Sequence, residues 1–374
     1  MKKVVVAMSG GVDSAVAAAL LTAEGYTAIG ITMQIWPPDN RKRGNRFGGC
    51  CGIDAVEDAR KVAYKLGIPH YVMNFRDIFT REVIDDFCQE YSRGRTPNPC
   101  IRCNQRIKFG PLQEKARELN ADFIATGHYA KIEIDESKGI PVLKKGFDRK
   151  KDQSYVLYPI AREQLASTLF PTGHYTKEKI REIATDMGLP VANKPDSQDI
   201  CFIEDNNYHK FLEEYAPEAV KAGPVIDESG NILGRHRGIM FYTIGQRRGL
   251  GIANITPLYV TAIDPKKNTI VVGDKEQVYG SGLIASSLNW LTINELKAPI
   301  TVSARIRYQH HEAEALVSPL GEDRVYVKFT EPQMAITPGQ AIVFYDGDTV
   351  IGGSIIEQKK DNGSEVAECQ SCLN

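Results

Sequence analysis

The chain has 374 residues, of which 42% are hydrophobic and 25% are charged, and its formal net charge at pH 7 is −1. This composition is typical of a globular protein with two or three domains, the near-neutral charge argues against a generic nucleic-acid binder, and no stretch approaches the roughly 20 apolar residues of a membrane-spanning helix. Because Met1-Lys2-Lys3 leads into a predicted strand without a signal or transit segment, we expect a cytoplasmic protein with no membrane partner.

The first 200 or so residues alternate between predicted strands and helices. The strands are expected at Lys3–Met8, Tyr26–Gln34, His70–Asn74 and Asp122–Thr126. The helices are expected at Asp13–Glu24, Asp54–Leu66, Asp77–Tyr91 and Asn104–Leu119. This alternation predicts a doubly wound parallel sheet, whose ligands bind beyond the carboxyl ends of the strands. Ser9 and Gly127-His128 both follow such ends, so we expect them to meet across one crevice.

A glycine-containing turn, Ser9-Gly10-Gly11-Val12-Asp13-Ser14, joins the first predicted strand to the first helix. The N–H groups at a helix N-terminus have no intrahelical partners and the helix dipole is positive there, so phosphate is stabilised. Gly10 and Gly11 let the backbone approach the anion. No Lys follows Gly11, so this is not a Walker A loop. The alternative is an ordinary turn with Asp13 or Ser14 as helix cap; we favour phosphate binding.

The helical alternation stops at about Ile203, and short strands follow. Those expected at Gly238–Thr243, Tyr259–Asp264 and Thr269–Gly273 form a small central module. Later ones, separated by short turns, predict a small antiparallel barrel or sandwich; they are expected at Val302–Tyr308, Ala313–Val317, Arg324–Phe329 and Ala341–Tyr345. The expected domains are residues 1–203, 204–282 and 283–358, followed by a polar tail over 359–374.

Eight cysteines in a reducing compartment favour sulfur chemistry, metal binding or burial over a disulfide framework. Cys103 is expected beside the N-terminus of a helix that begins at Asn104, with Arg102 next to it, and both features lower the pKa of a thiol. Cys88 lies in an apolar helical stretch and is expected to be buried. Taken alone, Cys201 is as compatible with burial as with catalysis.

Three basic clusters lie in glycine-containing segments and together would suit a track for nucleic-acid phosphates, although each alone is more typical of a solvated loop. They are Arg41, Lys42, Arg43 and Arg46; Lys144, Lys145, Arg149, Lys150 and Lys151; and Arg235, Arg237, Arg247 and Arg248.

Several short motifs stand in a fixed order along the chain. They are Ser9–Ser14, Gly94-Arg95-Thr96-Pro97-Asn98-Pro99 with Cys103-Asn104, Thr126-Gly127-His128-Tyr129, Lys151-Asp152-Gln153-Ser154-Tyr155, Ser197–Cys201, Gly245-Gln246-Arg247-Arg248-Gly249-Leu250-Gly251 and Arg307-Tyr308. With these motifs the chain resembles the tRNA-specific 2-thiouridylases (the MnmA/TrmU family) from residue 7 to about 355. The resemblance implies an α/β fold: an N-terminal doubly wound PP-loop ATP pyrophosphatase domain, a small central module and a C-terminal antiparallel β-barrel.

The resemblance also implies an activity, the ATP-dependent 2-thiolation of the wobble uridine of tRNA. The C2 oxygen of uracil attacks the α-phosphate of ATP, giving an adenylate and pyrophosphate, while Mg²⁺ neutralises the developing charge. Cys201 matches the residue that takes a persulfide from a cysteine desulfurase or sulfur-relay protein. Cys103 matches the nucleophile, which either releases sulfide or assists its transfer to C2 and leaves a Cys103–Cys201 disulfide. The implied ATP-binding residues are Ala7, Met8, Ser9, Gly10, Gly11, Val12, Asp13, Ser14, Met33 and Gly127.

The implied tRNA contacts come from several of these motifs. They are Asn98, Pro99, Cys100, His128, Lys151, Asp152, Gln153, Arg307, Tyr308 and Gln340. A flipped base needs a pocket, Tyr308 suits stacking, and Arg307 with Lys151 suits phosphates. The alternative for each residue is an ordinary surface polar residue or a core Tyr.

One departure from the family concerns Cys100, which stands where many members carry an Asp, so a carboxylate proposed to assist proton transfer is missing. Cys100, Cys103 and Cys201 would offer three thiolates to an iron–sulfur cluster with one open iron. We favour the persulfide route, which needs only two thiols. Cys369 and Cys372 form a further pair in the polar tail. They could complete a four-thiolate zinc site with Cys100 and Cys103, but a polar tail favours a mobile dithiol that helps sulfur delivery, or a pair without function.

Two rival functions stay open from the residues alone. Another PP-loop enzyme would adenylate a small substrate and would need neither Cys103 nor Cys201. A non-catalytic RNA-binding protein would use its Cys pairs to hold a metal. The combination of a nucleotide loop, two thiols and a β-rich C-terminal region favours the thiolase.

Overall fold

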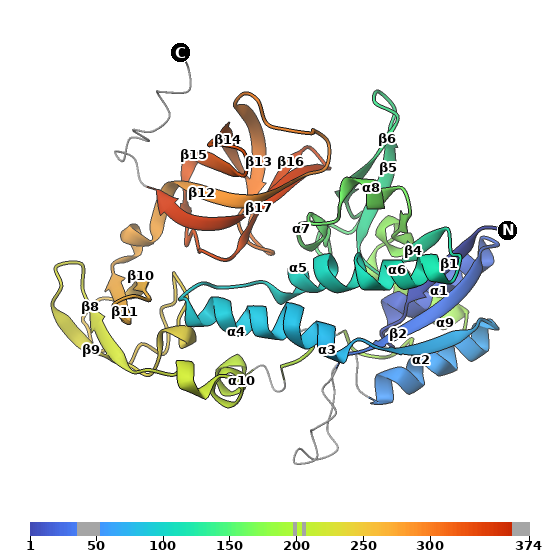
Figure 1. The fold of residues 1–374 in the computed structure, drawn as a ribbon, viewed down its shortest axis with the longest axis horizontal. Helices are drawn as coiled ribbons and strands as arrows, with labels where there is room; N and C mark the ends of the chain where they lie inside the picture. Colours follow the sequence, from blue (N-terminus) through green and yellow to red (C-terminus); the bar gives the residue numbers. More distant parts are fainter. Residues whose placement is uncertain (36–52, 197–199, 204–206, 361–374) are drawn as a thin grey trace. The chain divides into compact units, whose positions relative to one another are not determined.

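The structure is a computed structural model that describes residues 1–35, 53–196, 200–203 and 207–360 (Figure 1). The chain divides into two compact units. The first holds Met1–Asp85, Pro99–Tyr208 and Asp348–Val350, and the second holds Asp86–Asn98, His209–Gly347 and the described residues after Val350. The expected division into three domains stays a prediction.

The first unit is built on a parallel sheet, which confirms the predicted α/β class. Its strands are β1 (Lys3–Ala7), β2 (Thr27–Gln34), β3 (His70–Asn74), β4 (Phe123–Ala125) and β7 (Thr168–Leu169). Their order is β3-β2-β1-β4-β7, and every adjacent pair is parallel. The central strand β1 carries three fully buried valines at positions 4 to 6, as expected for a strand covered on both faces.

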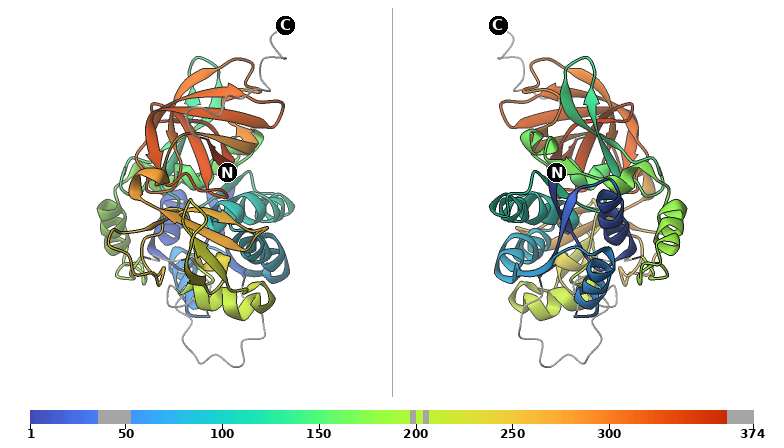
Figure 2. Two further views of the ribbon diagram at one scale, coloured as in Figure 1. Left: turned by 90° about the vertical axis from the view of Figure 1, so that its left-hand side faces the viewer. Right: turned by 90° about the vertical axis from the view of Figure 1, so that its right-hand side faces the viewer.

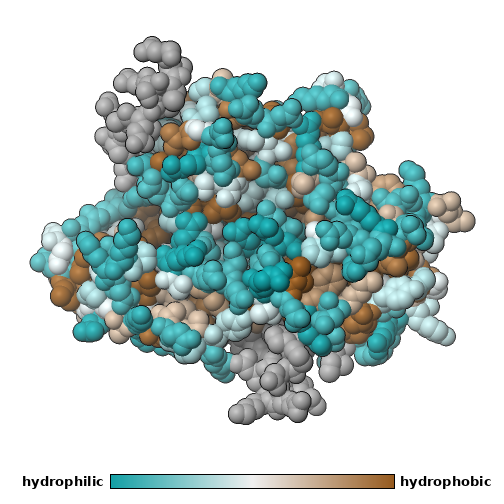
Figure 3. All heavy atoms as spheres, in the orientation of Figure 1, coloured by the Kyte–Doolittle hydropathy of each residue, from teal (hydrophilic) through white to brown (hydrophobic). Residues whose placement is uncertain are grey.

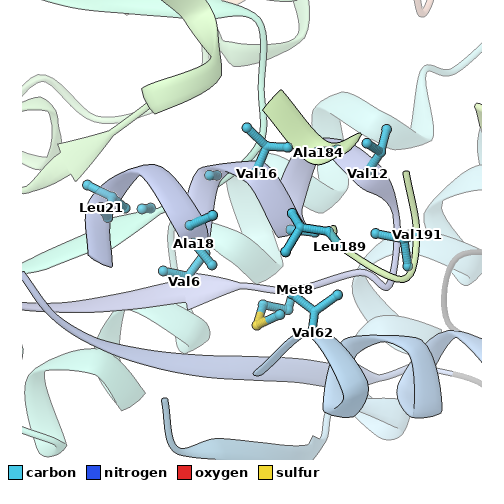
Figure 4. Close-up of a cluster of buried hydrophobic side chains, with 14 of the residues drawn as sticks. Val6, Met8, Val12, Val16, Ala18, Leu21, Val62, Ala184, Leu189 and Val191 are labelled. Atoms are coloured by element: carbon cyan, nitrogen blue, oxygen red, sulfur yellow. The ribbon is translucent and has the colours of Figure 1, made fainter. Parts of the chain in front are cut away.

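Helices cover this sheet, and the first of them is nearly all apolar. They are α1 (Val12–Ala23), α2 (Ile53–Leu66), α6 (Pro111–Glu118) and α9 (Lys177–Asp186). Because α1 contacts both α2 and α9 as well as the sheet, it buries side chains around its whole circumference. Figure 4 shows Val16 of α1 facing Ala184 of α9, and Met8 facing Val62 of α2. Each buried Val contributes roughly 1.5–3 kcal/mol of hydrophobic free energy, so α1 is held firmly.

Two of the predicted helices contain a π-helical turn. The helix predicted at Asp77–Tyr91 is confirmed apart from that turn, whereas the one predicted at Asn104–Leu119 is wrong in its start and is broken at Phe109–Gly110. The first consists of α3 (Arg76–Phe79), the π-helical turn η1 (Thr80–Ile84) and α4 (Asp85–Ser92). The second begins earlier than predicted and consists of α5 (Pro99–Cys103), the π-helical turn η2 (Asn104–Lys108) and α6. Pro99 suits a first helical position because its missing N–H has no partner there. Pro111 separates η2 from α6 because it cannot donate to a preceding turn.

The first unit also contains elements that the sequence analysis does not predict. They are the antiparallel hairpin of β5 (Ala130–Asp135) and β6 (Ile140–Lys145), the short helices α7 (Ser154–Leu157) and α8 (Arg162–Leu165), and the 3₁₀ turn η3 (Pro171–His174).

The second unit contains a small mixed sheet between Gly223 and Gly273. Its strands are β8 (Gly223–Ile226), β9 (Ile232–His236), β10 (Tyr259–Asp264) and β11 (Thr269–Gly273), in the order β10-β11-β8-β9. The predictions for β10 and β11 are confirmed. The strand predicted at Gly238–Thr243 is wrong: Ile239–Phe241 forms the 3₁₀ turn η6, in which three consecutive apolar side chains are all buried, whereas a strand would alternate. The helix α10 (Tyr208–Tyr215) was also not expected.

Six strands form the predicted C-terminal antiparallel barrel. They are β12 (Tyr279–Trp290), β13 (Ile300–Arg305), β14 (Ala313–Pro319), β15 (Arg324–Met334), β16 (Ala341–Asp346) and β17 (Thr349–Lys360). Their order is β12-β15-β14-β13-β16-β17, and pairing of β12 with β17 closes the ring, seen from two sides in Figure 2. The inward side chains form one buried cluster. The second unit also contains two further 3₁₀ turns, η5 (Pro217–Ala219) and η7 (Lys275–Val278).

Hydrophilic side chains cover most of the face drawn in Figure 3, and the apolar residues on it are scattered in small groups. Such scattered apolar exposure is normal for a globular protein. Within the described ranges, no helix combines the length and apolar character needed to cross a bilayer.

Candidate functional site

The turn between β1 and α1 has the backbone geometry of an anion cradle. Gly10 has φ +70°, and a Cβ on it would collide with the carbonyl oxygen of Ala55. Gly11 is the N-cap of α1, with extended φ −97° and ψ 163°, and within the described chain no side chain caps this helix. The predicted alternative, capping by Asp13 or Ser14, is therefore wrong. The first N–H groups of α1 stay available to a ligand.

Two serine hydroxyls hold the turn in this shape from inside. Ser14 Oγ accepts a hydrogen bond from the Ser9 N–H at 3.1 Å and donates one to the Gly11 carbonyl at 3.1 Å. The hydroxyls of Ser9 and Ser14 also lie 3.3 Å apart. These hydrogen bonds join residues of the turn and do not use the N–H groups at the start of α1. They therefore fix the shape of the cradle and leave those N–H groups to a ligand.

The predicted nucleotide-binding residues come to one edge of the sheet. Since β1 pairs in parallel with both β2 and β4, the carboxyl ends of all three strands meet there. Met33 lies near the end of β2, and Gly127 follows β4 and lies against the first turn of α1. Gly127 lies against Asp13 and Ser14 of the turn, whereas its expected meeting with Ser9 and the binding role of these residues stay predictions.

Charged side chains surround the start of α1. Asp13 Oδ1 accepts a hydrogen bond from the Tyr129 hydroxyl at 2.6 Å and from Lys177 Nζ at 2.6 Å. Lys177 Nζ also lies 5.7 Å from the centre of the Tyr129 ring. Burial, and then the charge of Asp13, raise the pKa of Tyr129 above its ordinary value, so Tyr129 stays a neutral donor.

Asp196 is the centre of this charged group. Its carboxylate lies 2.9 Å from Lys177 Nζ, 2.9 Å from Lys151 Nζ and 2.6 Å from Arg181 Nη2. Burial alone would raise its pKa, but the hydrogen bonds from Lys177 and then Lys151 outweigh burial and lower the pKa to about 2. Asp196 is therefore a carboxylate throughout the neutral range.

The segment Ala192–Asp196, which precedes the predicted Cys201 motif, is tied to the same turn. Arg181 Nη1 donates to the carbonyl oxygens of Ala192 and Lys194 at 3.1 and 3.0 Å. Lys194 Nζ in turn donates to the Gly10 carbonyl at 3.0 Å and to Asp58 Oδ2 at 2.7 Å. The sequence analysis did not identify these residues, because no local motif surrounds them. The one available signal was the absence of a Walker A Lys after Gly11, which indicates that a cation at the turn comes from another segment.

Cys103 does not lie at a helix N-terminus, so that prediction is wrong. The helix begins at Pro99, which places the exposed Cys100 in its first turn and the half-buried Cys103 at the end of α5. The partial positive charge of the helix dipole therefore acts on Cys100 rather than on Cys103, since it falls off within the first turn. Arg102 directs its Nη1 toward Gln105 Oε1 at 3.4 Å.

Cys201 lies in a short turn, in which the Ile203 N–H donates to the Ile200 carbonyl at 2.9 Å. Its neighbour Phe202 is buried and packs edge-to-face on Phe79 at 5.9 Å between ring centres. Phe79 ends α3, and the following turn η1 contacts α5. The segments of Cys103 and Cys201 therefore pack on one helical stretch, Arg76–Ile84. Ser197–Asp199 lie outside the described residues. Cys88 is buried, as predicted.

Among the described residues, no group of three His, Cys, Asp or Glu side chains is placed to hold a metal ion. The iron–sulfur alternative on Cys100, Cys103 and Cys201 therefore has no support in these residues. Cys369, Cys372 and the basic cluster of Arg41, Lys42, Arg43 and Arg46 fall outside the described ranges.

His128 is only 9% exposed and belongs to a buried polar chain. Its Nε2 lies 3.4 Å from Lys108 Nζ and its Nδ1 lies 2.6 Å from Thr126 Oγ1. Lys108 Nζ also donates to Asn104 Oδ1 at 3.0 Å. Since an ammonium only donates, Nε2 accepts and Nδ1–H donates. Burial, and then the charge of Lys108, lower the pKa of His128 well below 6.5, so it is neutral at pH 7.

The Lys151-Asp152-Gln153 motif makes internal contacts with all three side chains. Lys151 binds Asp196, as above. Asp152 is 5% exposed and accepts hydrogen bonds from the N–H groups of Gly146 and Ser154, both at 3.1 Å. Gln153 Oε1 accepts from the Tyr129 N–H at 2.9 Å. The Lys151 side chain is 43% exposed, whereas Asp152 is buried.

The predicted tRNA contacts in the second unit, Asn98, Arg307, Tyr308 and Gln340, are all half-buried. Gln340 Nε2 donates to the Thr96 carbonyl at 2.9 Å, and Arg307 Nη1 donates to the Met334 carbonyl at 3.1 Å. Both side chains therefore already hold backbone segments of their own unit.

The basic clusters differ in their pairing. In the cluster from Lys144 to Lys151, Lys144 pairs with Glu133 and Arg149 pairs with Asp348. Lys145 is buried and Lys151 pairs with Asp196, so this cluster is not simply a solvated loop. Arg237 lies 3.6 Å from Glu213, and its cluster neighbours Arg235, Arg247 and Arg248 are exposed.

Three family models match the chain in succession. One described as a tRNA methyl transferase HUP domain matches residues 2–205, one described as a tRNA methyl transferase PRC-barrel domain matches 209–274, and one described as an Aminomethyltransferase beta-barrel domain matches 280–356. The matched ranges run through the parallel sheet, the small sheet and the barrel.

Curated relatives carry another name, tRNA-specific 2-thiouridylase. The MnmA protein of Acetivibrio thermocellus is 53% identical over 356 residues, 95% of this chain and 99% of the relative. MnmA 2 of Caldanaerobacter subterraneus subsp. tengcongensis is 54% identical over 96% of this chain and 98% of its own. MnmA of Heliobacterium modesticaldum is 55% identical over 96% and 93%.

Proposed function

The chain belongs to the tRNA-specific 2-thiouridylases, a family of tRNA sulfurtransferases, and from that premise we propose that it replaces the C2 oxygen of the wobble uridine of tRNA with sulfur in an ATP-dependent reaction. The observation that carries the proposal is that one unit holds both an uncapped phosphate turn and the segments of Cys103 and Cys201. The small-substrate alternative would need neither cysteine.

The first step is adenylation. ATP binds with its phosphates on the N–H groups at the start of α1 and with Met33 and Gly127 beside it. The C2 oxygen of uracil attacks the α-phosphorus, the bond to the β-phosphate oxygen breaks, and pyrophosphate leaves with the electron pair. The turn is suited to this role because Ser9 and Ser14 fix its shape before the nucleotide arrives, so little reorganisation is needed.

Mg²⁺ would supply charge neutralisation at the polyphosphate. Within the described residues no three-ligand cluster is preformed, and Oδ1 of the nearest carboxylate, Asp13, already accepts two hydrogen bonds. The ion therefore fits best as a companion of ATP, with phosphate oxygens and water as most of its ligands, which is the usual coordination of Mg²⁺ in such sites.

The second step is sulfur transfer. Cys201 carries a persulfide sulfur received from a cysteine desulfurase or a sulfur-relay protein. In the direct route this terminal sulfur attacks C2, the C2–O bond breaks, and AMP leaves. The Cys103 thiolate then attacks the Sγ of Cys201 and breaks its bond to the transferred sulfur. C2 keeps the transferred sulfur, and a Cys103–Cys201 disulfide forms. An external thiol reduces that disulfide before the next turnover.

The remaining contacts recognise tRNA. Lys151, Arg307 and the exposed arginines of the second unit suit phosphates, and Tyr308 suits stacking on a base. Affinity for tRNA is therefore expected to fall steeply with salt.

The deciding experiment incubates the protein with tRNA, Mg-ATP and a persulfide donor, and then measures 2-thiouridine by nucleoside analysis. We expect no product from Cys103→Ser or Cys201→Ser, and continued pyrophosphate release from Cys201→Ser, because adenylation precedes sulfur transfer. Cys88→Ala, which removes a buried thiol outside the proposed site, is the matched control and is expected to keep activity. Iron bound to the active wild-type protein would favour the iron–sulfur alternative. Full pyrophosphate release with a small acceptor and no tRNA would contradict the proposal.

A further inference from the structure

The phosphate turn carries no cationic side chain of its own. Its six residues include an acid, Asp13, in the first turn of α1 and no Lys or Arg. Backbone N–H groups and the helix dipole attract an anion there, but they carry only partial charges. A carboxylate next to a polyphosphate repels it, so cationic side chains from elsewhere in the fold would add to the charge neutralisation that Mg²⁺ supplies.

Two lysines far along the chain are placed at this turn. Lys177 is the first residue of α9, and α9 packs beside α1 in the first unit (Figure 1). Its Nζ is 2.6 Å from Asp13 Oδ1 although the side chain is only 8% exposed. Lys194 lies at the end of the turn that contains the two glycines, with its Nζ 3.0 Å from the Gly10 carbonyl oxygen. Burying an ammonium is costly, and here the carboxylates of Asp13 and Asp196 offset that cost and hold Lys177 Nζ at the turn.

Cations and carboxylates lie together around the turn. The described contacts join the carboxylates of Asp13, Asp58 and Asp196 to the cations of Lys151, Lys177, Arg181 and Lys194. A fourth carboxylate, Asp148, accepts the backbone N–H of Lys177 at 3.1 Å. The charged side chains are therefore balanced in number, and the dipole of α1 adds the partial positive charge that suits an anionic ligand.

We propose that Lys177 and Lys194 are further nucleotide-binding residues, which supply the side-chain positive charge for the β- and γ-phosphates of ATP and stabilise pyrophosphate as it leaves. This rests on the proposed adenylation. When the bond between the α-phosphorus and the bridging oxygen breaks, that oxygen keeps the electron pair. The negative charge on pyrophosphate rises, and each ammonium donates a hydrogen bond to it while keeping its own protons.

A purely structural role is the competing explanation, in which Lys177 only neutralises Asp13. The two explanations differ in one double variant. If Lys177 only offsets the carboxylate, Asp13→Asn combined with Lys177→Met removes both charges and restores pyrophosphate binding. If Lys177 holds the phosphates, the double variant stays weaker than Asp13→Asn alone.

The experiment measures binding of inorganic pyrophosphate with Mg²⁺ by calorimetry, and tRNA-dependent pyrophosphate release in a single turnover. We expect Lys177→Met to weaken pyrophosphate binding at least about tenfold and to slow release by on the order of 100-fold, and Lys194→Met to act in the same direction. Lys177→Arg keeps the charge and recovers part of the loss. The matched control is Lys179→Met, an exposed lysine of the same helix that pairs with Glu182.

Thermal unfolding is followed for every variant. Should Lys177→Met fail to fold, the half-exposed Lys194→Met and the folded Lys177→Arg still decide the question. Wild-type pyrophosphate affinity in Lys194→Met together with restored affinity in Asp13→Asn/Lys177→Met would overturn the inference. The proposed function fails separately: wild-type protein that binds pyrophosphate but makes no 2-thiouridine contradicts the thiolation and not the lysine assignment.

Discussion

Gly127 lies so close to Asp13 that a Cβ on it would stand 2.6 Å from the Asp13 carbonyl carbon and 2.7 Å from the Ser14 nitrogen. Both neighbours are backbone atoms of the first turn of α1, so neither can rotate away. The glycine after β4 therefore sets how closely the two strand ends approach, and it brings the motif around His128 to the phosphate turn.

Replacing Gly127 by Ala is expected to displace the start of α1. We expect the free energy of unfolding to fall by roughly 1–3 kcal/mol, as for overpacked core sites, and ATP binding to be lost. Chemical denaturation and nucleotide titration measure both effects. The control is Gly110→Ala, where an added Cβ would lie 3.5 Å from the carbonyl oxygens of Gln105 and Arg106, an ordinary contact distance. Unchanged stability in Gly127→Ala would contradict the close approach.

Gly11→Ala separates binding from folding. Its φ of −97° suits any residue, and the nearest neighbour of an added Cβ is Ser9 Oγ at 3.5 Å. We expect stability within about 0.5–1 kcal/mol of wild type, but at least about tenfold weaker ATP binding, because the methyl group stands where the backbone must approach the phosphates. Unaltered affinity would mean that the phosphates lie elsewhere.

Asp196→Asn is expected to destabilise the first unit by roughly 1–3 kcal/mol at pH 7, because three cations lose their shared carboxylate. The pKa of Asp196 is lowered from 3.8 to about 2. Its contribution is therefore complete above pH 3.8 and is lost as the pH falls toward 2. Denaturation at several pH values should show a smaller loss across that window in Asp196→Asn. Glu182→Gln, which removes an exposed pair on α9, is the control; an equal effect there would contradict the central role of Asp196.

His128 makes stability depend on pH nearer to neutrality. Burial lowers the pKa of His128 in the folded state well below 6.5. Only the unfolded state gains a proton as the pH falls through 6.5, so stability is full above that value and declines below it. We expect the free energy of unfolding to fall less between pH 7.5 and 5.5 in His128→Gln. The exposed His174→Gln serves as control, and identical pH profiles for wild type and His128→Gln would exclude this role.

Gln340 is expected to position the Thr96–Asn98 segment rather than to act on tRNA alone. Its side chain donates to the Thr96 carbonyl, and the Thr96 N–H donates to the Pro338 carbonyl at 2.8 Å. Gln340→Ala should lower stability by about 1 kcal/mol and speed hydrogen exchange at Thr96. Gln333→Ala, which removes an exposed bond to Glu331, is the control. Normal exchange at Thr96 with weakened tRNA binding would indicate a direct contact instead.

Much of the fold follows from local patterns. The strands β3, β10 and β11 match the predicted ranges because their apolar residues and flanking turns lie within a few positions of one another. The start of the helix before Cys103 does not follow in this way. Pro97, Pro99 and Asn104 all suit a helix boundary, and packing of α5 against η1 and α7 selects Pro99. Because the helix begins at Pro99 and not at Asn104, the predicted effect of a helix N-terminus on the Cys103 thiol does not apply.

The sequence by itself determined the phosphate turn, the parallel sheet under it and the family, because each depends on residues that are adjacent or regularly spaced. Only the tertiary structure decided that Lys177 and Lys194 reach a turn more than 160 positions earlier, that Asp152 and Gln340 face inward, and that β12 closes the barrel on β17. Those contacts join segments with no pattern in common, and the energy that selects them comes from burying the whole fold at once.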